Sequence, residues 1–150
     1  MSQANSNAVA SFTKLNPGWR MVFLISVREF TGNVIPPFDP RGNRNANAGE
    51  LSRVVDVTFQ DEATGQQIHK NYSLDKPSYL TGLLDAIYPG QGRDLIASID
   101  WEDDEDIERL LGEDHPVLAK IYHEEWPANS GVMQNRIGAT VSADTDVASL

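Results

Sequence analysis

The chain has 150 residues, of which 40% are hydrophobic, no cysteine, and a formal net charge of −10. This length fits one domain with a modest core, and the lack of cysteine excludes disulfide scaffolds, thiolate metal sites and a cysteine nucleophile. No apolar run approaches the roughly 18 residues of a membrane-spanning helix, and the first residues lack the basic start and apolar stretch of a secretory signal. We therefore expect a cytoplasmic protein.

The negative charge is concentrated in the second half of the chain. Residues 1–76 carry eight basic and seven acidic side chains, whereas residues 77–150 carry four basic and fifteen acidic ones. Seven of the nine residues in 100–108 are acidic, a pattern typical of a solvated segment. The first half can therefore expose a basic surface although the whole chain is acidic.

The first predicted elements are an arm, a strand and a long loop. Residues 1–18 are mostly small and polar and end in a turn signal, which indicates a flexible N-terminal arm. Trp19–Phe30 has apolar residues at its odd positions from Met21 to Val27, so we expect a strand whose odd side chains face the core. Residues 31–50 are rich in proline, glycine and asparagine, which predicts a long loop without regular structure.

A hairpin and a helix follow. Leu51–Gln60 and Gln66–Leu74 are predicted strands on either side of a short turn, and the apolar positions 55, 57 and 59 share one face. Asp75 is typical of a helix N-cap. Apolar residues then recur at helical spacing from Tyr79 to Ile87, where a Tyr-Pro-Gly sequence stops the helix.

The rest of the chain is predicted as an irregular acidic connection followed by two strands. Apolar residues at 107, 110 and 111 indicate a short helix within the connection, which ends at Gly112. Val117–Trp126 and Met133–Ser142 are the two strands, and residues 143–150 form a short polar tail. In the last strand we expect three side chains to point inward: Ile137, Ala139 and Val141.

This order of elements predicts a mainly β fold. We expect a five-stranded OB-fold barrel over residues 19–142, with a helix between strands 3 and 4 and a short acidic helical connection. The same order is also compatible with a small α+β sandwich. In OB barrels the face of strands 2 and 3, with the loops at its edges, is the usual surface for nucleic acids.

Short motifs resemble the OB-type single-stranded DNA-binding proteins of phages and prophages. The resemblance covers residues 16–142 in pattern but only scattered motifs in identity. It implies a protein of the host cytoplasm that binds single-stranded DNA and works with phage replication or recombination proteins; a homo-oligomer is left open. The matching stretches are Asn16-Pro17-Gly18, the junction from Lys70 to Leu84, Leu110-Leu111-Gly112 with Pro116, the strand Val117 to Glu124 that includes His123, and Arg136 to Ala139.

Binding to single strands requires basic groups along the backbone path and exposed aromatic faces on which bases stack. Arginine outnumbers lysine eight to four, and guanidinium groups both stack on bases and bind phosphates. For each aromatic candidate, core or edge packing is the alternative interpretation. The candidates in the first three strands and their loop are Trp19, Arg20, Arg28, Phe30, Phe38, Arg41, Arg44, Arg53, Lys70 and Tyr72.

Other residues point less clearly to a site. Trp101 and Trp126 stand beside carboxylates, so we expect them in the core or at a subunit contact. Lys120 and Arg136 could extend the basic path along the last strands. The three histidines have no metal-binding spacing, and no nucleophile elbow, P-loop or dinucleotide fingerprint occurs. The sequence therefore predicts neither an enzyme nor a metal or other cofactor.

The leading hypothesis is thus a non-catalytic single-stranded DNA-binding protein of phage replication or recombination. The main alternative is a virion structural or assembly protein, such as a decoration, neck or tail component, because polar arms, β-rich patterning and net acidity would suit that role as well. A third hypothesis, an enzyme-inhibiting or DNA-mimicking protein, depends only on the acidic run at 100–108.

Overall fold

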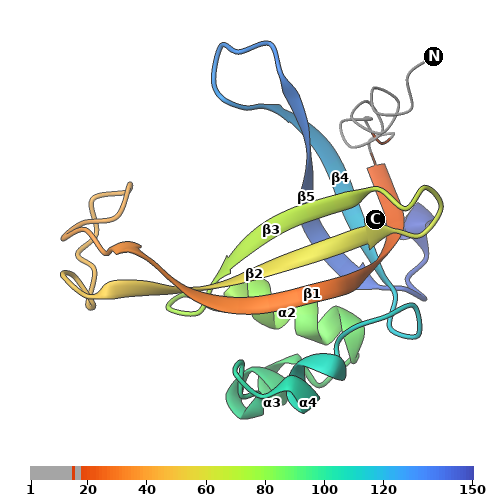
Figure 1. Ribbon diagram of the computed structural model, residues 1–150, viewed down its shortest axis with the longest axis horizontal. Helices are drawn as coiled ribbons and strands as arrows, with labels where there is room; N and C mark the ends of the chain where they lie inside the picture. Colours follow the sequence, from red (N-terminus) through yellow and green to blue (C-terminus); the bar gives the residue numbers. More distant parts are fainter. Residues whose placement is uncertain (1–14, 16–17) are drawn as a thin grey trace.

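The computed structural model describes residue 15 and residues 18–150 (Figure 1). In this part of the chain five strands form one antiparallel sheet in the order β3-β2-β1-β4-β5. Three helices connect β3 to β4. The elements are β1 (Gly18–Val34), β2 (Leu51–Asp61), β3 (Gln67–Ser73), α2 (Ser78–Ile87), α3 (Gly92–Ser98), α4 (Asp104–Glu108), β4 (Val117–Glu125), β5 (Met133–Ser142) and the 3-10 turn η1 (Val147–Ser149).

The predicted mainly β fold is confirmed, but the sheet is not closed by strand pairing. Strands β3 and β5 are its two edges, and no backbone ladder joins them within the described residues. The sheet curves, so that β5 passes close to β3, and α2 packs against the sheet (Figure 1). None of the helices in residues 18–150 has the length and apolar character needed to cross a membrane.

Strand β1 is longer than its sequence indicates. We expected it to end at Phe30, with a loop over residues 31–50, yet it continues to Val34 because it pairs with β2 as far as Leu51. Pairing between strands overrides a weak local strand propensity. Gly32 suits this position because a Cβ there would collide with the Ser52 hydroxyl. The loop between the strands, residues 35–50, is here called the β1–β2 loop.

The inward face of β1 also differs from the prediction. The register with β2 shifts between Leu24 and Ser26, which changes the face on which side chains lie. Val22 and Leu24 belong to the core before the shift, and Val27 packs against the core after it. Phe23, which was expected in the core, lies on the opposite face of the strand and is buried outside the main cluster.

A similar shift explains the error in β5. The register between β4 and β5 shifts between Ala119 and Ile121, so that Ile137 is buried, Ala139 is exposed and Val141 is only partly buried. Only Ile137 of the expected inward residues therefore belongs to the core.

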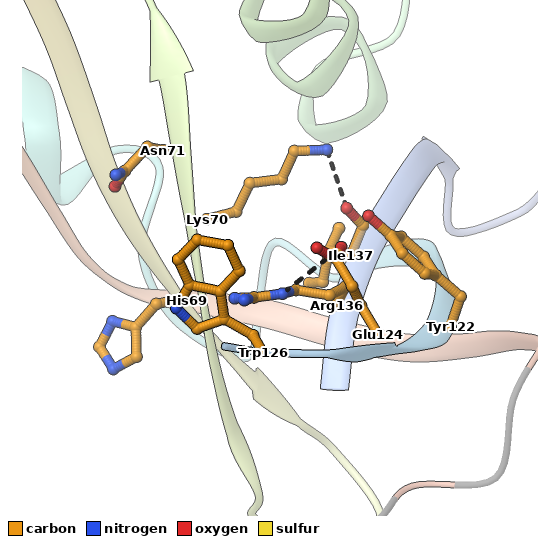
Figure 2. Close-up of a pocket in the computed structure, with 8 residues that line it drawn as sticks. All are labelled: His69, Lys70, Asn71, Tyr122, Glu124, Trp126, Arg136 and Ile137. Carbon is orange, nitrogen blue, oxygen red and sulfur yellow. Dashed lines mark hydrogen bonds and ion pairs between the residues drawn. The ribbon is translucent and has the colours of Figure 1, made fainter. Parts of the chain in front are cut away.

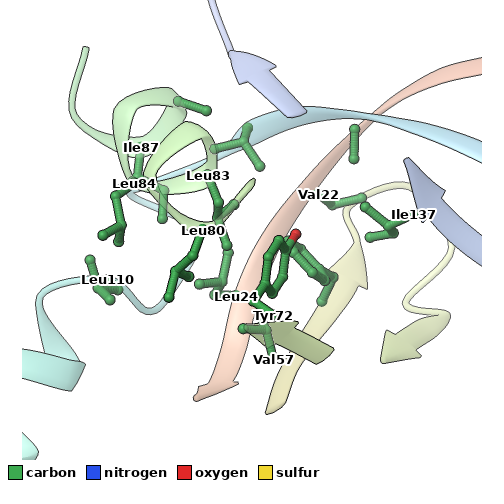
Figure 3. Packing of buried hydrophobic residues seen from close by; sticks show 14 of the residues in the cluster. Val22, Leu24, Val57, Tyr72, Leu80, Leu83, Leu84, Ile87, Leu110 and Ile137 are labelled. Atoms are coloured by element: carbon green, nitrogen blue, oxygen red, sulfur yellow. The ribbon is translucent and has the colours of Figure 1, made fainter. Parts of the chain in front are cut away.

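Figure 3 shows the core between the sheet and α2. The apolar face that was predicted for β2 is buried as expected. From α2, leucines at helical spacing pack against it, as the sequence predicted. The main buried side chains of this layer are Val55, Val57 and Phe59 from β2 and Leu80, Leu83, Leu84 and Ile87 from α2.

The helical connection departs from the expected irregular structure. Helix α2 begins at Ser78, and the Asp75 carboxylate, which was expected to cap it, instead accepts a hydrogen bond from the Arg53 backbone at 2.9 Å. Residues 92–98 form α3, and Gly92 allows its close approach to α2, because a Cβ there would lie 2.5 Å from the Thr81 carbonyl oxygen.

The acidic run forms α4 rather than an apolar helix at 107–111. Asp103 caps this helix by accepting a hydrogen bond from the Glu105 backbone at 3.3 Å. Acidic residues in a first turn favour helix formation, because they interact with the positive end of the helix dipole. Trp101, which was expected either in the core or at a subunit contact, is buried in the core beside this segment.

The predicted N-terminal arm and C-terminal tail are described to different extents. The predicted N-terminal arm, residues 1–18, falls outside the described residues except for Leu15 and Gly18. Leu15 is buried in the core, and its carbonyl oxygen lies 2.7 Å from His123 Nε2. The predicted polar tail, residues 143–150, contains the short turn η1.

One ion pair lies at the end of the sheet where β1 meets β2. Arg20, predicted to bind DNA, donates from Nε to Asp61 Oδ1 at 2.7 Å and from its terminal nitrogen to Oδ2 at 2.9 Å. Burial raises the pKa of the Asp61 carboxyl, but hydrogen bonds from Arg20 and Thr64 outweigh this effect and hold the pKa below its usual value. Arg20 is therefore committed to the fold.

We predict that Asp61→Ala lowers the free energy of unfolding by about 3 kcal/mol, because it leaves the Arg20 guanidinium without its partner. Urea denaturation measures this loss. The neighbouring exposed residue provides the control, and Glu62→Ala should cost less than about 0.5 kcal/mol. Since the pKa of Asp61 is lowered by folding, its contribution is present above the unfolded value of about 3.9 and is lost as the pH falls through the folded value. Equal costs for both variants at neutral pH would contradict the prediction.

Candidate nucleic-acid interface

An open groove lies between the two edges of the sheet. Residues of β3 form one wall, and the hairpin of β4 and β5 forms the other (Figure 2). Its volume is about 410 Å³, within the size range of small-ligand pockets. The lining residues are His69, Lys70, Asn71, Tyr122, Glu124, Trp126, Arg136 and Ile137.

The β4–β5 hairpin supplies two exposed aromatic side chains. Alternate residues of β4 up to Ile121 are buried, so the intervening positions point to the other face. Tyr122 is 44% exposed, and Trp126, directly after the strand, is 57% exposed. The Trp126 backbone closes the hairpin by donating to the Val132 carbonyl at 2.9 Å. Trp126 was expected in the core or at a subunit contact, and its exposure in the groove excludes the core.

Lys70 connects the two unpaired edges of the sheet. Its Nζ donates to the carbonyl oxygens of Ile137 at 2.9 Å and Gly138 at 3.2 Å, from β3 to β5. The ammonium also lies 5.1 Å from the centre of the Tyr72 ring. Burial lowers the pKa of Lys70. Lys70, which the sequence suggested as a phosphate ligand, is thus held by the protein itself.

The remaining polar groups of the groove are also partly engaged. Arg136 Nε lies 3.8 Å from Glu124 Oε2, a loose ion pair on the hairpin. His69 Nδ1 shares a hydrogen bond of 2.9 Å with the Thr58 hydroxyl. The aromatic faces of Tyr122 and Trp126 are therefore the least committed part of this surface.

Strand pairing joins the groove to the outer face of the sheet, meaning the face of β1, β2 and β3 that points away from the core. Residues directly opposite one another in an antiparallel sheet share a face. Three rows of the outer face lie between the groove and the β1–β2 loop, and the first two begin in the groove with His69 and Asn71. The rows are His69–Thr58–Ser26, Asn71–Asp56–Arg28 and Ser73–Val54–Phe30.

The β1–β2 loop lies beyond the end of this face, at the far end of the long β1–β2 pair (Figure 1). Phe38 and Arg44 form an isolated bridge, and the guanidinium of Arg44 lies 5.8 Å from the centre of the Phe38 ring. The Asp39 carboxylate accepts from the backbone N–H groups of Asn43 and Arg41, which lowers its pKa. Arg41 and Arg44 are exposed, and neither forms an ion pair with a described carboxylate.

Three other candidates do not join this surface. Tyr72 is 3% exposed and packs in the core, so no base can stack on it. Arg53 lies on the opposite face from Phe30, with its Nε donating to Glu29 Oε1 at 2.9 Å. Trp19 lies at the other end of β1, where the Lys120 ammonium is 5.9 Å from its ring centre.

The structure thus brings together residues that were not in the predicted set. Tyr122 is not among the predicted binding residues, and Trp126 was expected in the core or at a subunit contact because carboxylates precede it in the sequence. The only local signal is that Tyr122 follows the buried alternate positions Ala119 and Ile121, which places it on the opposite face of β4. The position of Tyr122 and Trp126 opposite β3 depends on the curvature of the sheet and has no local signal.

We predict that Lys70→Ala lowers the free energy of unfolding by about 2 kcal/mol, because hydrogen bonds from a charged donor to two edge carbonyls are lost. Chemical denaturation checks this value. Lys76→Ala is the matched control, since the Nζ of Lys76 is exposed and makes one long contact of 3.4 Å, to Asn45. A Lys70 variant as stable as the control would show that the ammonium does not hold the two edges together.

No protein-family model matches the chain, and no curated protein matches it either. Among the residues that the structure describes, no group of three or more histidine, aspartate or glutamate side chains could hold a metal ion. The chemistry of the site is therefore interpreted from its own residues: exposed aromatic faces, engaged cations and a polar sheet face.

Proposed function

We propose that this protein is a non-catalytic single-stranded DNA-binding protein of phage replication or recombination. The strand lies in the groove between β3 and the β4–β5 hairpin and continues over the outer face towards the β1–β2 loop. One observation carries this proposal: Tyr122 and Trp126 expose their rings in a groove that also contains Arg136. The resemblance of the sequence to phage proteins supplies the biological setting.

Exposed aromatic side chains in a groove are suited to unpaired bases. A base stacked on an aromatic ring contributes roughly 1–3 kcal/mol, whatever its identity, because every base has a flat π-face. Bases in a duplex are stacked on one another and are not available to such a surface. The groove therefore favours single strands without strong sequence preference.

The location of the groove supports an OB-type interpretation of the fold. Oligonucleotides bind OB barrels over strands 2 and 3 and beside the loops that join strands 1 to 2 and 4 to 5. Here the groove lies between β3 and the β4–β5 hairpin, and the β1–β2 loop lies beyond the other end of the outer face. We therefore propose an open OB barrel in which Lys70 spans the seam between β3 and β5.

The distribution of charge is compatible with a nucleic-acid partner. Arg28 on the outer face and Arg41 and Arg44 in the β1–β2 loop are exposed. The acidic helix α4 lies with α3 on the side of the sheet opposite the β4–β5 hairpin (Figure 1). The acidic run of α4 therefore lies away from the proposed path of the strand, whereas Asp56 on the outer face and Glu124 in the groove lie on it.

A second candidate function is virion assembly, and the β1–β2 pair favours it. Val34 and Leu51 are opposite one another at the end of this pair and are 61% and 54% exposed. A pair of exposed apolar side chains on a projecting element is suited to a protein contact. Absence of binding to oligo-dT at low salt would favour this role over the first.

We predict that Trp126→Ala weakens binding of a fluorescent oligo-dT by about 5- to 150-fold, because a stacking surface for one base is lost. Fluorescence anisotropy titration measures the change, and Tyr122→Ala should act in the same direction. Val147→Ala removes an exposed apolar side chain that does not line the groove and should leave affinity unchanged. If wild type binds and the Trp126 variant binds equally well, the strand does not occupy the groove.

We predict that the double variant Arg41→Ala/Arg44→Ala binds oligo-dT more weakly and with a smaller salt dependence. If both guanidinium groups contact phosphates, the slope of log K against log salt should fall by about 1.4, at about 0.7 per phosphate. Titrations between about 50 mM and about 200 mM salt measure the slope. The control is Arg93→Ala/Arg109→Ala, which removes the same charge from the helical connection. An equal effect of both double variants would mean that only net charge matters.

A further inference from the structure

A carboxylate stands among the aromatic side chains of the groove. Glu124 occupies the position of β4 between Tyr122 and Trp126, and all three line the groove (Figure 2). Its side chain is about half exposed. Strand pairing places Tyr122 opposite Arg136, so Glu124 and Arg136 are diagonal neighbours on the same face. A carboxylate at this point is unexpected in a surface that only attracts a polyanion.

Both cations of the groove are engaged with the protein. Arg136 faces Glu124, with 3.8 Å between Nε and Oε2. Lys70 donates to the carbonyl oxygens of Ile137 and Gly138. A phosphate that entered the groove would have to displace Glu124 from Arg136 and would be repelled by the carboxylate at the same time. A base that stacks on the ring of Tyr122 or Trp126 neither displaces Glu124 from Arg136 nor is repelled as a phosphate is.

We propose that Glu124 is a specificity-determining residue that restrains Arg136, so that the groove recognises unpaired bases rather than phosphates. This inference rests on the proposed function and specifies which part of the strand the groove reads. Glu124 is a positioning residue for Arg136. Its carboxylate lowers the affinity of the groove for any polyanion, and it lowers that affinity most for polyanions that have no bases to stack.

The proposal gives Glu124→Gln three expected effects. The variant frees Arg136 for a phosphate, so affinity for oligo-dT rises about two- to fivefold, the range of an exposed ion pair. The slope of log K against log salt becomes steeper by about 0.7, for one added phosphate contact. Binding of inorganic polyphosphate, which has no bases, rises by a larger factor than binding of oligo-dT.

The experiment titrates the full-length protein with oligo-dT and with inorganic polyphosphate at several salt concentrations. The matched control is Glu108→Gln, which makes the same charge change on α4 outside the groove. Arg136→Gln and the double variant Glu124→Gln/Arg136→Gln complete a cycle, because an effect that acts through Arg136 must vanish when Arg136 is absent. Thermal melting of each variant verifies that it is folded.

The outcomes separate this inference from the proposed function. Tighter binding and a steeper slope for Glu124→Gln, with the added slope lost in the Arg136→Gln background and both effects absent from the Glu108 control, support the inference. If wild type binds oligo-dT but Glu124→Gln binds with unchanged affinity and slope, or if the steeper slope persists without Arg136, the inference is wrong and the proposed function stands. If neither wild type nor Glu124→Gln binds oligo-dT at low salt, the proposed function itself fails.

Discussion

The ammonium of Lys70 bonds to two carbonyl oxygens of β5, and the groove depends on this contact. Edge strands normally expose unpaired backbone groups. Here β3 and β5 approach each other without a ladder, and one side chain satisfies the carbonyls of Ile137 and Gly138. A closed ladder would bring the two edges to the spacing of paired strands, about 4.8 Å. The link through a long side chain leaves room between them, and that room is the groove.

Seven basic side chains of the sheet and the β1–β2 loop fall into two groups with different roles. Arg20, Arg53, Lys70 and Arg136 each have an internal partner, either a carboxylate or a backbone carbonyl. Arg28, Arg41 and Arg44 are exposed on the outer face and the β1–β2 loop. The proposed interface therefore combines stacking in the groove with phosphate contacts at the far end. This division suits an acidic protein that binds a polyanion, because stacking contributes affinity that does not depend on a positive charge of the protein, and the exposed arginines supply positive charge locally.

Several features of the fold could be predicted from local patterns. The two apolar faces of β2 and β4 and the leucines of α2 follow periods that depend only on neighbouring residues. The inward face of β1 and the exposure of Ala139 in β5 could not be predicted in this way. The pairing of each strand contains a register shift that moves side chains to the other face. A register shift is decided by the partner strand, and period-two patterns do not show it. The helix at 92–98 has no local signal because its seven residues bury only Gly92 and Leu95, which is too few to show a helical period.

The sequence by itself determined the order of the elements along the chain, the mainly β character and the concentration of acidic residues in the second half. It also indicated the arginines of the β1–β2 loop as exposed. Each of these features depends on composition or on residues close together in the chain. Only the tertiary structure decided which candidates are free to bind. Arg20 and Arg53 form ion pairs with carboxylates of the protein, and Tyr72 is buried in the core. Lys70 bonds to Ile137, 67 residues away in sequence, and so connects the two edges of the sheet. The curvature of the sheet brought Tyr122 and Trp126 opposite β3. Contacts between distant residues leave no periodic trace in a single sequence, so this groove could be recognised only in the folded chain.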